Sequence, residues 1–222
     1  MSEPLRVVVL ISGSGSNLQT LIDGQQAGRL PIDIRAVVSN RADAYGLERA
    51  RAAGIPTHVL SHRGYADRAH YDADLAALVD EFQPGLVVLA GFMRILTPAF
   101  VARYSGRLIN IHPSLLPAYR GLRTHERVLA DGCGEHGCSV HFVIPELDAG
   151  PVIVQARVPV EPNDTPESLH QKVQVQEHRA YPLAVRWIAE GRACLDNGEV
   201  RFQRVPDGRP PVIDADTDID AL

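Results

Sequence analysis

The chain has 222 residues, of which 45% are hydrophobic and 22% are charged, and both fractions are typical of globular proteins. Its net charge of -5 argues against a basic surface that would attract nucleic acid or an anionic membrane. Three cysteines do not suit a secreted disulfide framework, and no apolar run approaches the roughly 18 residues of a membrane span. We therefore expect a soluble, cytoplasmic protein that binds neither nucleic acid nor membranes.

Short apolar runs alternate with helical patterns through the first half of the chain. The predicted strands are residues 7–11, 32–39, 57–60 and 86–90. The helical patterns between them cover residues 16–27, 44–53 and 71–82. Repeated strand–helix–strand units of this size predict parallel strands joined by right-handed crossovers. The first half is therefore predicted to be a doubly wound, Rossmann-like α/β sheet with helices on both faces.

The second half has a different pattern. Its predicted strands are residues 108–112, 138–144, 152–160 and 200–205, and one long helix is predicted over residues 167–188 in spite of Pro182. We interpret these strands as a mixed sheet that continues the mostly parallel one. Because no linker interrupts the pattern, residues 1–205 are predicted to form a single domain. Residues 206–222 are acidic and contain prolines, which indicates a loosely held tail.

A loop of small residues, Ser12 to Asn17, joins the first predicted strand to the first predicted helix. Small residues let backbone N–H groups approach an anion at a helix N-terminus, where the helix dipole favours negative charge. The dinucleotide-binding pattern requires a glycine where this chain has Leu18, and an acidic residue where it has Ser39 and Asn40. The loop therefore favours a single phosphate, with a plain tight turn and helix cap as the alternative.

Asn110 and His112 lie at the end of a predicted strand, which Pro113 cannot continue. Alternate residues of a strand point to the same face, and ligand sites of open α/β sheets lie beyond the carboxyl ends of strands. An amide can stabilise a developing oxyanion while an imidazole transfers protons, a combination that suits acyl-type transfer. The alternative is a buried structural histidine with a neighbouring turn asparagine.

Asp148 lies in a predicted turn between two strands, and its local sequence favours an ordinary turn aspartate. If Asp148 approached His112, its carboxylate would fix the imidazole tautomer and raise the pKa of His112. The spacing of the two residues does not establish that they meet.

Two further groups carry weaker signals. Cys133, His136, Cys138 and His141 invite a zinc interpretation, but their spacing is at the edge of known sites and part of the group falls in a strand. The polar run from Gln174 to His178 lies in the middle of the long helix, where a solvated face is the usual interpretation. No pattern of a serine hydrolase or of a nucleoside triphosphatase is present.

Taken together, the motifs resemble the phosphoribosylglycinamide formyltransferase family, the folate-dependent formyltransferases of purine biosynthesis. The resemblance runs from about Val7 to Trp187. It rests on VVVLISGSGSNLQTLID, AVVSNRADAYGLERARAAGIPT, VVLAGFMRILTPAFV, GRLINIHPSLLPAYRGLRTH, GCSVHFVIPELDAGPVIVQARVPV and QVQEHRAYP. The fold that it implies is the Rossmann-like formyltransferase fold.

The resemblance implies a set of site residues. Asn110, His112 and Asp148 match the family's catalytic trio. The positions that match contacts to phosphoribosylglycinamide are Gly15, Ser16, Asn17, Gln174 and Glu177. The positions that match contacts to folate are Arg68, Met93, Arg94, Ile95, Leu96, Asn110, Ile144 and Asp148. The chain departs from the family around Arg120 and Arg123, so substrate contacts by these two side chains stay open.

The resemblance also implies a reaction: direct transfer of the formyl group of 10-formyl-tetrahydrofolate to the amine of phosphoribosylglycinamide, without a metal or a covalent enzyme intermediate. The partners would be small-molecule substrates, and the protein a monomer or weak homodimer. A formyltetrahydrofolate hydrolase would use the same trio with water as acceptor, and methionyl-tRNA formyltransferase would need positive charge for RNA. The alternative from another class is a non-catalytic nucleotide-binding module.

Overall fold

The structure is a computed structural model that describes residues 3–203 and 209–222. It divides into two compact units, Met1–Asn110 and Ile111–Leu222, and the boundary falls inside strand β5 (Leu108–His112). The predicted boundary between a domain ending at residue 205 and a tail starting at 206 lies outside the described residues.

The first unit is built on parallel strands. Strands β1 (Leu5–Ile11), β2 (Ile32–Ser39), β3 (Thr57–Val59) and β4 (Leu86–Leu89) are joined by β5 in the order β5-β4-β1-β2-β3. Every pair in this series is parallel. The apolar run from Val7 to Ile11 is fully buried, as expected of a central strand covered on both faces. The predicted strand–helix alternation is thus confirmed here.

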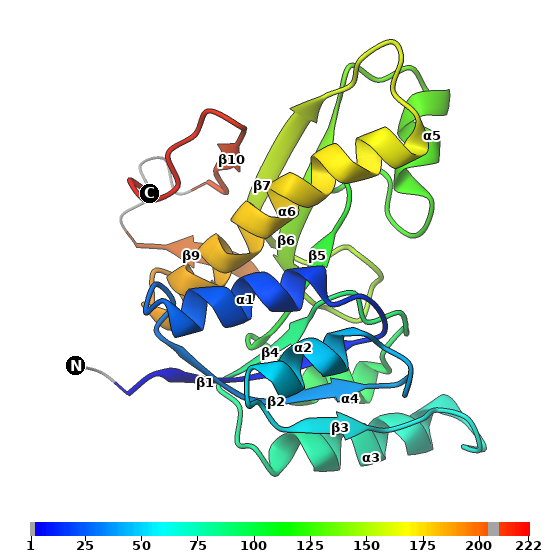
Figure 1. Cartoon of the computed structure of the whole chain (residues 1–222), viewed down its shortest axis with the longest axis vertical. Helices are drawn as coiled ribbons and strands as arrows, with labels where there is room; N and C mark the ends of the chain where they lie inside the picture. Colours follow the sequence, from blue (N-terminus) through cyan, green and yellow to red (C-terminus); the bar gives the residue numbers. More distant parts are fainter. Residues whose placement is uncertain (1–2, 204–208) are drawn as a thin grey trace. The chain divides into compact units, whose positions relative to one another are not determined.

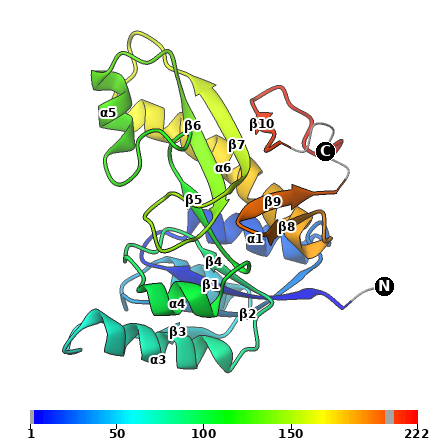
Figure 2. The same cartoon turned by 180° about the vertical axis from the view of Figure 1, so that it is seen from behind.

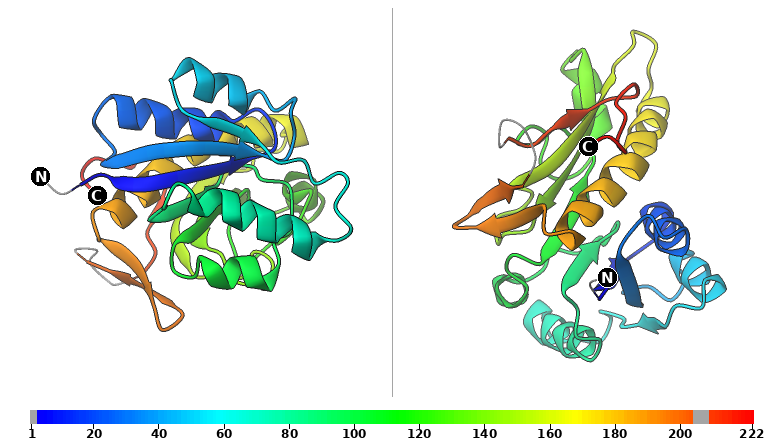
Figure 3. Two further views of the ribbon diagram at one scale, coloured as in Figure 1. Left: turned by 90° about the horizontal axis from the view of Figure 1, so that it is seen from below. Right: turned by 90° about the vertical axis from the view of Figure 1, so that its left-hand side faces the viewer.

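Helices cover both faces of this parallel sheet (Figure 3). Helices α1 (Ser16–Gln26) and α2 (Gly46–Ala52) lie on one face, and α3 (Arg68–Asp80) and α4 (Pro98–Arg103) lie on the other (Figures 1 and 3). Helix α4 was not predicted, because six residues are fewer than two turns and leave no clear apolar period. Thr97 caps its start by accepting a hydrogen bond from the Phe100 N–H.

The second unit is mixed. Strands β6 (Glu135–Phe142) and β7 (Val152–Pro159) pair antiparallel, and β10 (Val212–Ile213) adds to β7 in parallel. A separate hairpin is formed by β8 (Ala193–Asp196) and β9 (Glu199–Phe202). The predicted strand over residues 200–205 is therefore found at Glu199–Phe202, and its positions 204 and 205 lie outside the described residues. Mostly parallel strands followed by mixed ones confirm the predicted α/β class.

Helix α6 (Pro166–Ala189) packs along β6 and β7 (Figure 2). Thr165 and Ser168 form a reciprocal capping box at its start, and Pro166 occupies the first turn, where a missing N–H costs nothing. The helix continues through Pro182, and its buried face includes Trp187, which is 1% exposed. In residues 3–203 and 209–222, no helix is long and apolar enough to cross a membrane.

Helix α5 (Thr124–Ala130), which was not predicted, is joined to β6 by a pair of histidines. His125 Nδ1 lies 3.0 Å from His136 Nε2, and the His170 ring packs edge-on against His125. His136 is 1% exposed. Burial, and secondarily the neighbouring imidazoles, lower the pKa of His125 and of His136 to about 4, so both rings are neutral at pH 7.

The C-terminal segment differs from the loosely held tail that its composition indicates. Ile213 is 1% exposed beside β7, and Gln155 N–H donates to the Pro211 carbonyl at 3.0 Å. Arginines of the α6 region donate to main-chain carbonyls of the segment: Arg179 to Asp214 and Thr217, Arg186 to Ile219, and Arg192 to Leu222. These long-range contacts are invisible in the local composition from which the tail was judged.

Replacement of Ile213 by alanine is expected to destabilise the second unit by about 2 kcal/mol or more, because it removes buried methyl groups beside β7. The matched control is Val212→Ala, because Val212 is 49% exposed and should cost less than about 1 kcal/mol. Urea unfolding followed by the fluorescence of Trp187, the single tryptophan, measures both values. Equal costs for the two variants would contradict the packing of this segment.

The His125–His136 pair should make the free energy of unfolding depend on pH in the acidic range. An unfolded histidine takes up a proton near pH 6.5, whereas these folded residues do so only near pH 4. Their neutral state therefore contributes stability that is complete above pH 6.5 and is lost as the pH falls toward 4. Urea unfolding between pH 7.5 and 4.5 should show this fall, with a slope of up to about 1.4 kcal/mol per pH unit for each histidine. His136→Gln should flatten the slope, and an unchanged slope would contradict the assignment.

Candidate active site

Asn110 and His112 occupy alternate positions of β5, at its carboxyl end. Pro113 follows directly, so the strand ends where the sequence predicts. His112 is 6% exposed, and its Nε2 donates to the Tyr119 carbonyl at 2.9 Å. Its Nδ1 lies 3.4 Å from Asp148 Oδ2. Both ring nitrogens thus face acceptor oxygens, and a protonated imidazole can donate to both.

Asp148 lies in the turn between β6 and β7 and is held there in a left-handed conformation, with φ of 47°. Its side chain is 9% exposed, so groups of the protein, and not water, must stabilise the charge of the carboxylate. The Gly121 N–H donates to Oδ2 at 3.0 Å, and His141 Nε2 lies 3.9 Å from Oδ1. Asp148 therefore lies next to His112, although its local sequence favours an ordinary turn aspartate.

The loop between β5 and α5 lies against this histidine–aspartate pair. Its contacts to the pair come from the backbone of Tyr119 and Gly121. Arg120, whose role the sequence leaves open, pairs with Glu146 at 2.6 Å and has its carbonyl held by Arg127 at 2.7 Å. Arg123 is exposed and lies 3.9 Å from Glu126. Main-chain atoms thus make the contacts to His112 and Asp148, whereas the two arginine side chains pair with acids of the surrounding segments.

Three of the four residues with a possible zinc pattern have other partners, and the fourth, Cys138, is fully buried in β6. His136 pairs with His125, as described above, and Cys133 Sγ lies 3.1 Å from the Tyr119 hydroxyl. His141 Nδ1 donates to the Phe142 carbonyl, and burial lowers the pKa of His141. Within the described part of the chain, no three His, Cys, Asp or Glu side chains are grouped so that they could hold a metal ion.

The polar residues of α6 are less exposed than a solvated face would be, so that interpretation is wrong. Glu177 is 9% exposed and Gln176 is 4% exposed, while Gln174 is half-buried. Burial, with a secondary contribution from the negative charge of Glu177, raises the pKa of the Cys138 thiol and of the Tyr181 hydroxyl. Glu177 is thus a buried carboxylate within electrostatic reach of Cys138 in β6.

The small-residue loop of the first unit links β1 to α1, and the helix begins at Ser16. Gly15 adopts the left-handed conformation (φ 71°), and Asn17 is buried at 9% exposure. Ser12, at the start of this loop, donates to Asn40 Oδ1 at 2.6 Å and accepts from the Met93 N–H at 2.8 Å. The loop is therefore tied to the segment that follows β4.

The segment after β4 presents two apolar side chains to solvent: Met93 is 68% exposed and Ile95 is 54% exposed, while Leu96 is buried. Arg94 stacks over the Tyr71 ring at 4.5 Å, and its Nε finds no hydrogen-bond partner among the described residues. Arg68 is the exposed first residue of α3. In the second unit, Ile144 is half-buried in the turn that also carries Asp148.

One residue with a structural role in this region has no signal in the sequence. Arg49 of α2 donates to the Ser14 carbonyl at 2.9 Å and so contacts the small-residue loop from a segment 35 residues away. The sequence predicts the helix but gives no reason to single out this arginine among the 22 lysines and arginines of the chain.

Comparisons with known proteins agree with the pattern of motifs. The family model described as formyl transferase matches residues 5–185. Phosphoribosylglycinamide formyltransferase of Escherichia coli is 56% identical over 204 residues, which cover 91% of this chain and 96% of that protein. The enzyme of the same name from Haemophilus influenzae is 45% identical, with 86% of this chain and 90% of that protein covered.

Solved structures give the same result. The structure of the phosphoribosylglycinamide formyltransferase from Coxiella burnetii has a TM-score of 0.89 and 52% sequence identity. It covers 95% of this chain and 100% of its own. The resemblance seen in the motifs therefore extends over nearly the whole sequence and its backbone. The chain belongs to the formyl transferase family.

Proposed function

We propose that the protein transfers the formyl group of 10-formyl-tetrahydrofolate to the amine of phosphoribosylglycinamide, a step of purine biosynthesis. The observation that carries this proposal is the 56% identity to the enzyme of that name over 91% of the chain. The buried His112–Asp148 pair supports it independently, because formyl transfer needs a group that moves protons beside the reacting carbon.

His112 is the proposed acid–base residue. Asp148 orients its ring, since a carboxylate 3.4 Å from Nδ1 favours the form that carries a proton there. The amine of the acceptor attacks the formyl carbon, the carbonyl oxygen gains negative charge, and the carbon–nitrogen bond to the folate breaks. The Asn110 amide would donate to that oxygen, and one such donor is worth roughly 3–4 kcal/mol. His112 would deliver a proton to the departing nitrogen, and the attacking amine loses one proton as its new C–N bond becomes an amide, so the protons balance.

The acceptor is proposed to bind through its phosphate at Gly15, Ser16 and Asn17. A left-handed glycine directly before an α-helix turns backbone N–H groups toward one point, where the helix dipole favours an anion. Gln174 and Glu177 of α6 are the other residues proposed to contact this substrate. A half-buried amide and a nearly buried carboxylate can accept hydrogen bonds from the hydroxyl and amine groups of the acceptor.

The residues after β4 fit a folate. Exposed Met93 and Ile95 offer apolar surface to a flat ring. The buried Arg94 Nε has no hydrogen-bond partner among the described residues, so it can donate to an acceptor atom of the folate. Leu96, exposed Arg68, and Asn110, Ile144 and Asp148 complete the proposed folate contacts. The folate supplies the formyl group, while these residues bind and orient it.

The proposed partners are small molecules, the proposed location is the cytoplasm, and the proposed assembly is a monomer or weak homodimer. The alternative within the same chemistry is a hydrolase that gives the formyl group to water. The loop at Gly15 favours the transferase, because water has no phosphate for this loop to bind.

The first test is turnover of 10-formyl-tetrahydrofolate by the purified protein, with and without phosphoribosylglycinamide. Folate absorbance should change only when the ribonucleotide is present, and formylated phosphoribosylglycinamide should appear in equal amount. Equal turnover without the acceptor would mean a hydrolase, and no turnover in either case would contradict the proposal.

His112→Ala is expected to reduce kcat by about 1000-fold or more, because it removes the group that transfers the proton to the departing nitrogen. Equilibrium binding of both substrates should stay measurable, which separates lost chemistry from lost folding. His70→Ala is the matched control, since His70 is exposed on α3 and its ring bonds to Asp67, three residues away. Retention of most of the wild-type rate by His112→Ala would exclude the assigned role.

A further inference from the structure

Helix α2 packs against the small-residue loop and donates hydrogen bonds to two consecutive carbonyls of that loop. The Gly46 N–H donates to the Gly13 carbonyl at 3.0 Å, and Arg49 Nε donates to the Ser14 carbonyl at 2.9 Å. The two backbones approach so closely that a Cβ on Gly15 would lie 2.6 Å from Gly46 Cα. The fit therefore requires glycine at position 15.

These two hydrogen bonds fix more than the carbonyls. In a trans peptide unit the C=O and the following N–H point in opposite directions. A Gly13 carbonyl held by α2 therefore aims the Ser14 N–H away from α2. In the same way, the Ser14 carbonyl held by Arg49 aims the Gly15 N–H away from α2. Two successive N–H groups are thus turned to the side of the loop opposite Arg49, which is the arrangement of backbone anion sites.

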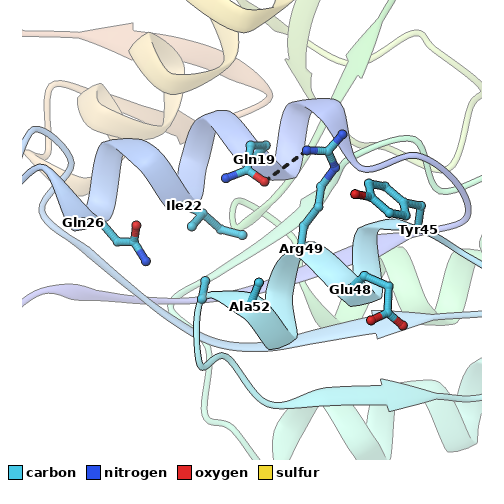
Figure 4. Close-up of a pocket in the computed structure, with 8 residues that line it drawn as sticks. Gln19, Ile22, Gln26, Tyr45, Glu48, Arg49 and Ala52 are labelled. Carbon is cyan, nitrogen blue, oxygen red and sulfur yellow. Dashed lines mark hydrogen bonds between the residues drawn. The ribbon is translucent and has the colours of Figure 1, made fainter.

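Arg49 is itself held in place by its neighbours. Its Nη1 donates to Gln19 Oε1 at 3.1 Å, and its guanidinium lies 4.9 Å from the centre of the Tyr45 ring (Figure 4). These residues line a groove of about 440 Å³ between α1 and α2. The planar guanidinium of Arg49 is restrained by one aromatic ring and two hydrogen-bond acceptors. The side chain therefore has little conformational freedom left to lose while it bonds to the loop. Its orientation is therefore set before any ligand arrives.

From this geometry we infer that Arg49 is a positioning residue for the phosphate of the acceptor: it orients the Ser14–Gly15 peptide so that the Gly15 N–H faces the anion. The inference rests on the proposed phosphate role of Gly15, Ser16 and Asn17. Arg49 acts through the peptide and does not touch the substrate. Loss of the Arg49 side chain should therefore weaken binding of the acceptor's phosphate and leave the chemistry at the formyl carbon unchanged.

The test compares two acceptors, phosphoribosylglycinamide and the same molecule without its phosphate. Arg49→Ala should reduce kcat/KM for the phosphorylated acceptor by about tenfold or more, mainly through KM, because a charge-assisted hydrogen bond that orients the loop is lost. With the dephosphorylated acceptor, the loss should be less than about twofold. The KM for 10-formyl-tetrahydrofolate should stay unchanged.

Two further variants complete the design. Arg51→Ala is the matched control, because Arg51 lies on the same helix and pairs with exposed Glu48 instead of with the loop. Arg49→Lys keeps the charge but not the planar fork, so it should fold and lose a smaller part of the same discrimination.

The outcomes separate the inference from the function on which it rests. Arg49→Ala and Arg49→Lys that match Arg51→Ala on the phosphorylated acceptor would overturn the positioning role. Equal losses on both acceptors would also overturn it, because they would indicate a general effect on folding. Wild-type protein that uses both acceptors equally well would contradict the phosphate assignment itself, whatever the variants do.

Discussion

The buried carboxylate of Asp148 is the constraint on which the histidine site of the second unit depends. A carboxylate with 9% exposure needs hydrogen-bond partners, because an unpaired buried charge costs several kcal/mol. Polar groups from three places surround it: the Gly121 N–H in the loop before α5 donates to it, and His112 Nδ1 of β5 and His141 Nε2 of β6 lie 3.4 Å and 3.9 Å away. The same loop returns a carbonyl to His112 Nε2. The ring, the acid and the loop backbone therefore fix one another.

The small-residue loop of the first unit is built on another principle. There the backbone is oriented by carbonyls whose partners lie on α2, and side-chain charge enters only through Arg49. Because glycine supplies both the left-handed turn and the close approach at Gly15, small side chains and precise orientation go together. A loop of this kind suits an anion that is read by main-chain donors, whereas the Asp148 site suits a group that gains and loses protons.

The sequence predicts much of this architecture, and its failures have physical causes. Continuous apolar runs such as Val7 to Ile11 are unambiguous because both faces of the strand are buried. Helix α4 was missed because its six residues carry no readable period. The strand end at His112 was predicted from Pro113, but the approach of Asp148 could not be, since no spacing encodes a contact across 36 positions. Buried Glu177 looked solvated because helical periodicity does not distinguish a polar face turned inward.

The arginines of the α6 region bind the C-terminal segment almost entirely through main-chain oxygens, those of Asp214, Thr217, Ile219 and Leu222. Every amino acid presents the same carbonyl. Homologous chains could therefore exchange most side chains of this segment without losing its path, and Ile213 is the position where identity still matters. The C-terminal segments of homologues can thus differ in sequence and still share one backbone path. A sequence alignment alone would underestimate their structural similarity.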